Sequence, residues 1–179
     1  MNWANDVGVL TDQGRQEANL VGKHLQEHHI DVVYVSDLHR TRETAQEIAQ
    51  HVKAEQHLTS GIRERNLGIF GDLTLAEIKQ KWPEKYAKFL DHSDIYWNGL
   101  AGESLHDVHV RFQAFLRSLQ QKHADKNVLL VTHSGILYTV LRDIYHFFPQ
   151  DSWMDVAHTS ITILEKSDNT YILKSFNKI

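Results

Sequence analysis

The residues best suited to chemistry follow a short apolar run near residue 130. The four apolar residues 128–131 lead into Thr132, His133 and Ser134, and Gly135 then begins an amphipathic segment. This order predicts a buried strand that ends in a turn and a helix N-terminus. Ligands of open α/β sheets bind at such strand ends, and the free N–H groups of a helix N-terminus favour anions. His133 is therefore a candidate phosphate-binding residue, with a purely structural histidine as the alternative.

A second strand end carries an arginine. Residues 31–35 predict a short buried strand, and Arg40 lies in the first turn of the helix expected after it. An arginine is unfavourable near the positive end of a helix dipole, whereas a bound anion would offset that cost and accept its paired N–H donors. Because parallel strands end at the same edge of a sheet, we expect Arg40 to converge with His133. The alternative for Arg40 is an ion pair with Glu43 or Glu47 on the helix surface.

Glu64 is the candidate carboxyl group for proton transfer to a leaving group. It stands between Arg63 and Arg65, so a solvated ion pair is its structural alternative. The two flanking arginines are better explained as rim charges or substrate contacts than as catalytic groups.

The elements that must position these residues alternate between helices and short apolar strands. Thr11 is a candidate N-cap for the first helix, Ser36-Asp37 for the second, and Ser104 with Asp107 forms a capping box for a helix over 105–119. Strands are expected over 31–35, 128–131, 160–165 and 171–176, and a strand or loop over 58–70. The helix that follows Ser36-Asp37 is expected to run to about residue 52. Further helices are expected over 74–91, with a break at Pro83, and over 136–147. This alternation predicts an α/β fold in which helices flank a mostly parallel sheet.

Composition restricts the possible classes of protein. The chain has 179 residues, no cysteine, 41% hydrophobic residues and a formal net charge of −4. We expect a single domain over residues 1–179, with no disulfide or thiolate metal site. The negative charge argues against nucleic-acid binding as the function. The sequence shows no apolar run long enough to cross a membrane and no secretory leader. The expected location is cytoplasmic.

Five stretches, taken in order, resemble the histidine phosphatase superfamily, also called phosphoglycerate mutase-like. The stretches are Leu10–Gly14 with Gln16-Glu-Ala18, Ser36–Arg40 with Glu43-Thr-Ala45, Arg63-Glu64 with Leu67-Gly68 and Phe70-Gly71, Gly102–Ser104 with Arg111, and Val131–Gly135. Each alone is weak, but their shared order over residues 6–165 is specific. Ser134 stands where the family usually has glycine.

The resemblance implies a mechanism and a set of roles. In the family, a histidine in an Arg-His-Gly motif attacks phosphorus, a carboxylic acid protonates the leaving oxygen, and a second histidine and two arginines bind the phosphoryl oxygens. Carried over, His133 is the second histidine, Arg40 one of the arginines and Glu64 the general acid, and Ser134 joins the substrate-binding residues. No metal or other cofactor is implied, and the expected partner is a phosphorylated small molecule.

The resemblance breaks down at the N-terminus, because the sequence contains no Arg-His-Gly. If Met1-Asn2 corresponds to positions just past that motif, the first strand and the nucleophilic histidine would lie upstream of Met1. Either the chain begins internally, or it is a shortened relative without catalytic competence. In both cases neighbouring strands would have unpaired edges, so we expect rearranged N-terminal residues or a homodimer across the gap.

Two functions are therefore expected. The first is a phosphatase that acts on phosphate monoesters through a phosphohistidine and is inactive as this truncated chain. Residues 72–101 are too short for the helical insertions of dedicated mutases, which favours a phosphatase. The second is a non-catalytic relative that binds a phosphorylated ligand or a protein partner.

Overall fold

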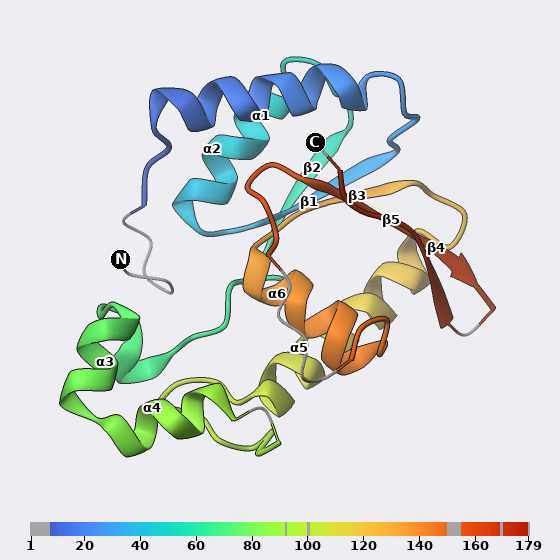
Figure 1. The fold of residues 1–179 in the computed structure, drawn as a ribbon. Helices are drawn as coiled ribbons and strands as arrows, with labels where there is room; N and C mark the ends of the chain where they lie inside the picture. Colours follow the sequence, from blue (N-terminus) through green and yellow to red (C-terminus); the bar gives the residue numbers. More distant parts are fainter. Residues whose placement is uncertain (1–7, 92, 100, 150–154, 169, 179) are drawn as a thin grey trace.

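The computed structural model describes residues 8–91, 93–99, 101–149, 155–168 and 170–178. Its central strand, β1 (Val32–Ser36), pairs in parallel with β2 (Glu55–Thr59) on one side and β3 (Val128–Val131) on the other (Figure 1). Val35 is in register with both Leu58 and Val131. The three strands therefore end at the same edge, as the predicted parallel sheet requires.

Helices cover both faces of this sheet. α1 (Asp12–Leu25) and α2 (His39–Ile48) lie over one face, while α5 (Leu105–Lys122) and α6 (Ser134–Tyr138) lie over the other (Figure 1). Side chains of a strand point alternately to opposite faces. Val33 and Val35 thus join the core beneath α1 and α2, whereas Tyr34 packs against the core beneath α5 and α6. The α/β fold expected from the sequence is confirmed.

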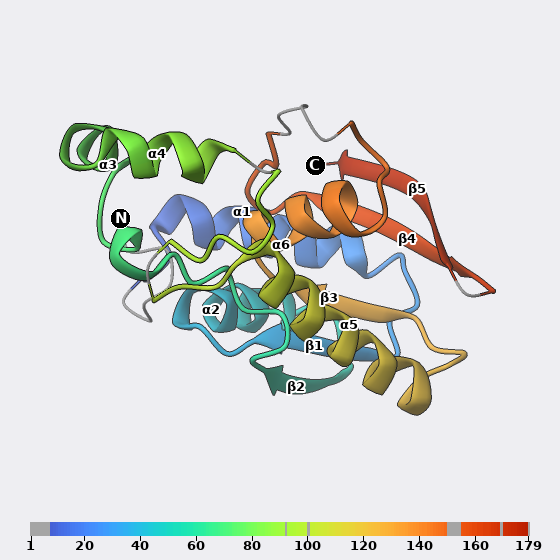
Figure 2. The same ribbon diagram turned by 90° about the horizontal axis from the view of Figure 1, so that it is seen from below.

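The C-terminal strands form a separate antiparallel hairpin. β4 (Ile161–Ser167) and β5 (Thr170–Lys178) confirm the two strands expected there, and Figure 2 shows the hairpin beyond β3, on the side away from β1. Within the described residues, β3 pairs only with β1 and β4 only with β5. The expected rearrangement of N-terminal residues falls on residues 1–7, outside the described part, and the homodimer stays a prediction.

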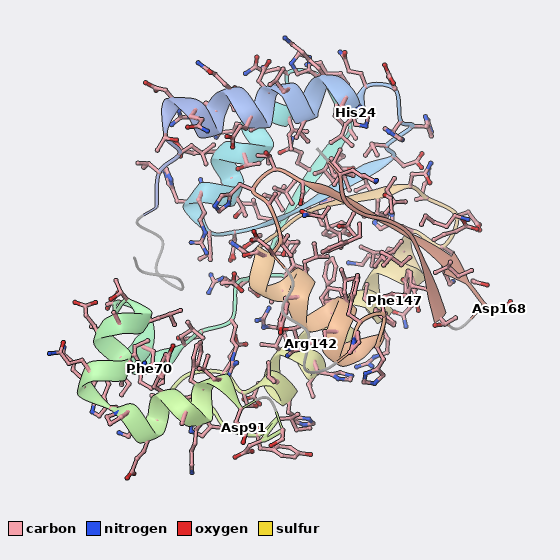
Figure 3. All side chains as sticks on the ribbon, in the orientation of Figure 1. His24, Phe70, Asp91, Arg142, Phe147 and Asp168 are labelled. Carbon is pink, nitrogen blue, oxygen red and sulfur yellow. The ribbon has the colours of Figure 1, made fainter. Side chains whose placement is uncertain are left out.

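Residues 68–91 and 93–99 form a small helical lobe beside the sheet. It contains a 3-10 turn (Gly68–Phe70), α3 (Leu75–Lys81) and α4 (Pro83–Leu90), so the helix break expected at Pro83 is confirmed. Phe70 is fully buried in it (Figure 3), with ring centroids 5.8 Å from Trp82, 6.0 Å from Phe89 and 5.7 Å from Trp97. Aromatic packing therefore gives this lobe its own small core.

Local capping patterns predicted two helix starts correctly and one wrongly. Thr11 caps α1, and the box of Ser104 and Asp107 begins α5. However, α2 begins after Leu38, which makes no side-chain cap, because the Ser36 hydroxyl bonds to His133 and the Asp37 carboxylate to Arg63. Both side chains that the pattern assigned to the cap make tertiary hydrogen bonds instead.

Other element bounds also differ from expectation. α2 ends at Ile48 rather than near residue 52, and the strand considered over 58–70 is β2 at 55–59, followed mostly by irregular backbone. The helix expected over 136–147 begins at Ser134 and passes into a π-helix over Thr139–Ile144. None of the described helices has both the length and the apolar character needed to cross a membrane.

Candidate active site

The candidate site lies where β1 and β3 end side by side. His133 is the residue before α6, and Ser36 is the last residue of β1. Both side chains are buried, with 8% and 0% exposure, and His133 Nε2 lies 2.8 Å from Ser36 Oγ. The hydrogen bond fixes the imidazole at the edge of the sheet where the predicted strand ends converge.

The burial of His133 sets its charge. Burial lowers the pKa of His133 to about 3, and the positive charges of Arg40 and Arg111 act in the same direction. The imidazole is therefore neutral near pH 7 and has one N–H donor and one acceptor nitrogen. A neutral donor of this kind can bind a phosphoryl oxygen without requiring a buried charge when the site is empty.

Glu64 lies in the loop over residues 60–66, which follows β2, and is only 9% exposed. Its carboxylate accepts the backbone N–H of Arg65 at 2.9 Å and that of Gly135 at 3.2 Å. Burial raises the pKa of Glu64, while these two hydrogen bonds and the charges of Arg40 and Arg111 oppose the shift. Burial shows that the solvated ion pair considered for Glu64 is wrong, and a raised pKa suits a proton donor.

Gly135 leaves the space that the Glu64 carboxylate occupies. A Cβ atom added at Gly135 would lie 2.3 Å from Glu64 Oε1, well inside van der Waals contact. The glycine therefore brings the start of α6 close enough to hydrogen-bond the acid. The sequence indicated Gly135 as a turn residue but not this contact.

Arg40 lies in the first turn of α2, as predicted, and is partly buried. That turn has no acidic residue. Burial is the largest cause of both pKa shifts, and it lowers the pKa of His133 but raises that of Glu64. The positive charge of Arg40 lowers both pKa values. Arg40, His133 and Glu64 are thus electrostatically coupled at one edge of the sheet. Ser134 is exposed at the first position of α6.

The arginines beside Glu64 are tied to the protein. Arg63 donates from Nε and Nη2 to the two carboxylate oxygens of Asp37, at 2.6 and 2.8 Å. Arg65 donates to the backbone oxygens of Glu103 at 2.8 Å and Trp97 at 3.2 Å. These contacts link the Glu64 loop to the end of β1 and to the segment that leads out of the helical lobe.

Sequence reasoning missed two residues that shape the site. Ser36 was assigned to a helix cap, because only the pairing of β1 with β3 brings it to His133. Arg111 was noted only through the family resemblance, yet its charge reaches both Glu64 and His133. The role of Arg111 could not be assigned before the packing of α5 against the Glu64 loop was known.

Comparison with known proteins places this geometry in a family. The family model of the histidine phosphatase superfamily (branch 1) matches residues 2–179. Phosphoserine phosphatase 1 of Hydrogenobacter thermophilus is 31% identical over 126 residues, which cover 70% of this chain but 59% of that protein's length. Phosphoglycerate mutase-like protein 4 of Arabidopsis thaliana is 32% identical over 178 residues, covering 86% of this chain and 77% of that protein.

A solved structure agrees with the sequence relatives. A variant of phosphoserine phosphatase from Entamoeba histolytica, in complex with phosphoserine, superposes with a TM-score of 0.81 at 27% identity, covering 99% of this chain and 87% of that one. The fold, with its sheet and the helices on both faces, is therefore shared. This chain belongs to the histidine phosphatase superfamily, branch 1.

Proposed function

We propose that the site binds the phosphoryl group of a small phosphate monoester and that the protein is a phosphatase. His133 and Arg40 bind phosphoryl oxygens, Ser134 is a further substrate-binding residue, and Glu64 protonates the leaving oxygen. The observation that carries the proposal is the buried Glu64 carboxyl, whose pKa is raised, at the same sheet edge as His133 and within the field of Arg40. A proton donor beside cationic and N–H donors matches what phosphoryl transfer requires.

The chemistry follows the family's phosphohistidine route. A histidine nitrogen forms a bond to phosphorus while the ester P–O bond breaks, and Glu64 gives its proton to the departing oxygen. Water then attacks the phosphohistidine, and the Glu64 carboxylate takes up the proton from that water. His133 and Arg40 stabilise the negative oxygens in both steps.

The nucleophile is the part of this route that the 179 residues do not contain as an Arg-His-Gly motif. His133 is buried against Ser36 and already serves as the second histidine in the proposal. We therefore infer that this chain binds phosphate but does not turn over a phosphate ester by itself.

A phosphatase is favoured over a mutase. The described residues of the lobe hold two short helices, α3 and α4, and the family resemblance implies longer helical insertions for the dedicated mutases. Relatives named 2,3-bisphosphoglycerate-dependent phosphoglycerate mutase occur as well, but the name phosphoserine phosphatase recurs among both the sequence relatives and the solved structures. Phosphoserine is therefore the first monoester to test.

Binding of inorganic phosphate tests the site without relying on turnover. We expect saturable binding by the wild-type chain at constant ionic strength, weakened about tenfold or more in His133→Gln and in Arg40→Gln, because each loses a donor to a charged oxygen. Titration calorimetry measures the affinity, and phosphoserine is titrated in the same way.

The matched control is Arg117→Gln, which removes an exposed positive charge from α5 far along the helix from its start. It should bind phosphate like the wild type. Absence of saturable binding in the wild type, or equal loss in all three variants, would contradict the proposed site.

A non-catalytic phosphate-binding protein is the second candidate, favoured by the absence of Arg-His-Gly from the sequence. It would bind phosphate as above but would have no nucleophile in any natural form. The codons that precede Met1 in the gene distinguish the two, since an in-frame Arg-His-Gly there would exclude the non-catalytic candidate.

A further inference from the structure

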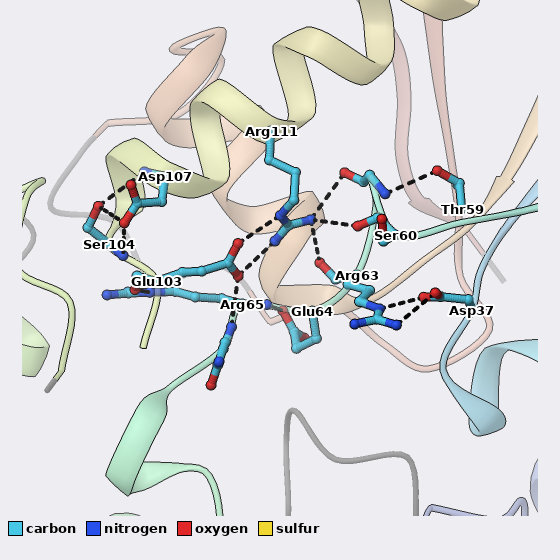
Figure 4. A network of polar contacts seen from close by, with 12 residues as sticks. Asp37, Thr59, Ser60, Arg63, Glu64, Arg65, Glu103, Ser104, Asp107 and Arg111 are labelled. Carbon is cyan, nitrogen blue, oxygen red and sulfur yellow. Dashed lines mark hydrogen bonds and ion pairs between the residues drawn. The ribbon is translucent and has the colours of Figure 1, made fainter. Parts of the chain in front are cut away.

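One arginine of α5 holds the loop that carries Glu64. Arg111 Nη1 donates to the backbone oxygens of Ser60 at 3.4 Å, Gly61 at 3.1 Å and Arg63 at 3.0 Å (Figure 4). These three carbonyl groups precede Glu64 and belong to irregular backbone outside any strand ladder, although the Ser60 oxygen also accepts the backbone N–H of Arg63 at 3.2 Å. The loop is thus fixed to α5 on the N-terminal side of the acid.

Glu103 holds the same loop on the other side of the acid. Its two carboxylate oxygens accept Arg111 Nε at 2.8 Å and Arg111 Nη2 at 2.9 Å, and Oε2 also accepts the backbone N–H of Asn66 at 3.0 Å. Its backbone oxygen accepts Arg65 Nε at 2.8 Å. In Figure 4 the Arg111–Glu103 pair lies between α5 and the loop, with bonds reaching residues before and after Glu64.

We propose that Arg111 and Glu103 are positioning residues that keep the Glu64 carboxyl at the end of α6. This inference rests on the proposed role of Glu64 as the acid. The carboxylate has little room for error, because its acceptor bonds come from Arg65, in the tied loop, and from Gly135, where even a Cβ atom would collide with it. The planar guanidinium supplies several N–H donors in fixed directions, and a lysine ammonium does not reproduce that fork.

The competing explanation is that Arg111 acts only through its charge. Burial is the main cause of the raised pKa of Glu64, and the charge of Arg111 opposes it. If Arg111 positions the loop, its loss lets water reach Glu64, and the pKa of Glu64 falls toward its ordinary value. If Arg111 supplies charge alone, its loss raises the pKa of Glu64 further. The two explanations thus predict opposite signs.

The test is a carbon-13 NMR titration of the Glu64 carboxyl, assigned with the Glu64→Gln variant. We expect the pKa of Glu64 to fall in both Arg111→Gln and Arg111→Lys, since lysine keeps the charge but not the fork. A pKa that rises in Arg111→Gln and stays at the wild-type value in Arg111→Lys would overturn the proposal. Arg117→Gln, on the exposed face of the same helix, should leave it unchanged.

Glu103→Gln provides a second variant should Arg111 variants fail to fold. Backbone hydrogen exchange of Arg65 and Gly135, the two N–H donors to Glu64, is expected to become about tenfold faster, while Val33 and Val35 in β1 keep their rates. Unchanged exchange at both donors would refute the positioning role. Absence of phosphate binding by the wild type would instead refute the proposed function. The two outcomes can be told apart, because neither the NMR titration nor the hydrogen-exchange measurement uses phosphate.

Discussion

At the scale of single residues, the site depends on a hydrogen bond between side chains 97 positions apart in the sequence, His133 and Ser36. His133 could be identified from its neighbours, because an apolar strand followed by a polar turn is a local pattern. Its partner could not, because the bond exists only when β1 and β3 pair with Val35 level with Val131. Strand order and register are properties of the folded sheet, so Ser36 was assigned to a local cap.

The lowered pKa of His133 makes a prediction about stability and pH. Burial and the nearby arginines lower this pKa from 6.5 to about 3. The unfolded chain takes up a proton near pH 6.5 and the folded chain does not. The free energy of unfolding is therefore not reduced by His133 above pH 6.5, and it decreases as the pH falls from 6.5 toward 3. The decline attributable to His133 approaches about 1.4 kcal/mol per pH unit within that window.

His133→Gln should remove this part of the decline. Urea unfolding between pH 7 and pH 4 should give a free energy of unfolding that falls less steeply for the variant than for the wild type. His158→Gln, which changes an exposed histidine, is the control and should follow the wild type. Parallel curves for His133→Gln and the wild type would show that His133 titrates normally in the folded protein.

At the scale of elements, the three residues that precede α5, Gly102, Glu103 and Ser104, have separate structural roles. A Cβ atom at Gly102 would lie 2.5 Å from the Asn66 oxygen, so only glycine allows this close approach. Glu103 binds Arg111, and Ser104 caps the helix. The cap could be predicted because its partner is three residues away. The tasks of Gly102 and Glu103 involve a loop almost forty positions earlier, so only the resemblance indicated that they matter.

Ser104→Ala tests how much the start of α5 contributes to stability. The 2% exposed Ser104 side chain accepts the Asp107 N–H at 3.1 Å and donates to Asp107 Oδ2 at 2.7 Å. Loss of an N-cap serine costs about 1 kcal/mol, and burial should bring the cost to about 2 kcal/mol in the free energy of unfolding. Ser118→Ala, on the exposed surface of α5, should change it by less than about 0.5 kcal/mol in urea unfolding. Equal effects would show that the capping box contributes nothing measurable.

At the scale of the whole molecule, the sequence predicted the layers better than their assembly. Helix and strand periodicity, with strand-end chemistry, was enough for the α/β class and for the edge where His133 and Arg40 gather. The separation of the β4–β5 hairpin from the parallel sheet, and the lobe with its own aromatic core, depend on contacts such as those of Phe70 that no local pattern encodes.

The absence of Arg-His-Gly from the whole chain leads to a prediction about turnover. The 179-residue chain should not hydrolyse an aryl phosphate measurably above the buffer rate, because it contains the proposed phosphate-binding residues and the proposed acid but no Arg-His-Gly. A chain extended at its N-terminus by an apolar strand ending in Arg-His-Gly should turn over. Within the described residues, β3 has a strand on only one side, and a strand added parallel to its other side would end at the edge where His133 lies.

The dependence of the restored activity on Glu64 makes the test specific. General acid catalysis contributes about 10²- to 10⁴-fold, so Glu64→Gln in the extended chain should lower kcat by that order for a poor leaving group, and by much less for an aryl phosphate, whose oxygen needs little protonation. Steady-state kinetics with phosphoserine and an aryl phosphate measure the difference. Turnover by the 179-residue chain itself would mean that another residue serves as the nucleophile, and equal losses on both substrates would assign Glu64 a role other than proton donation to the leaving group.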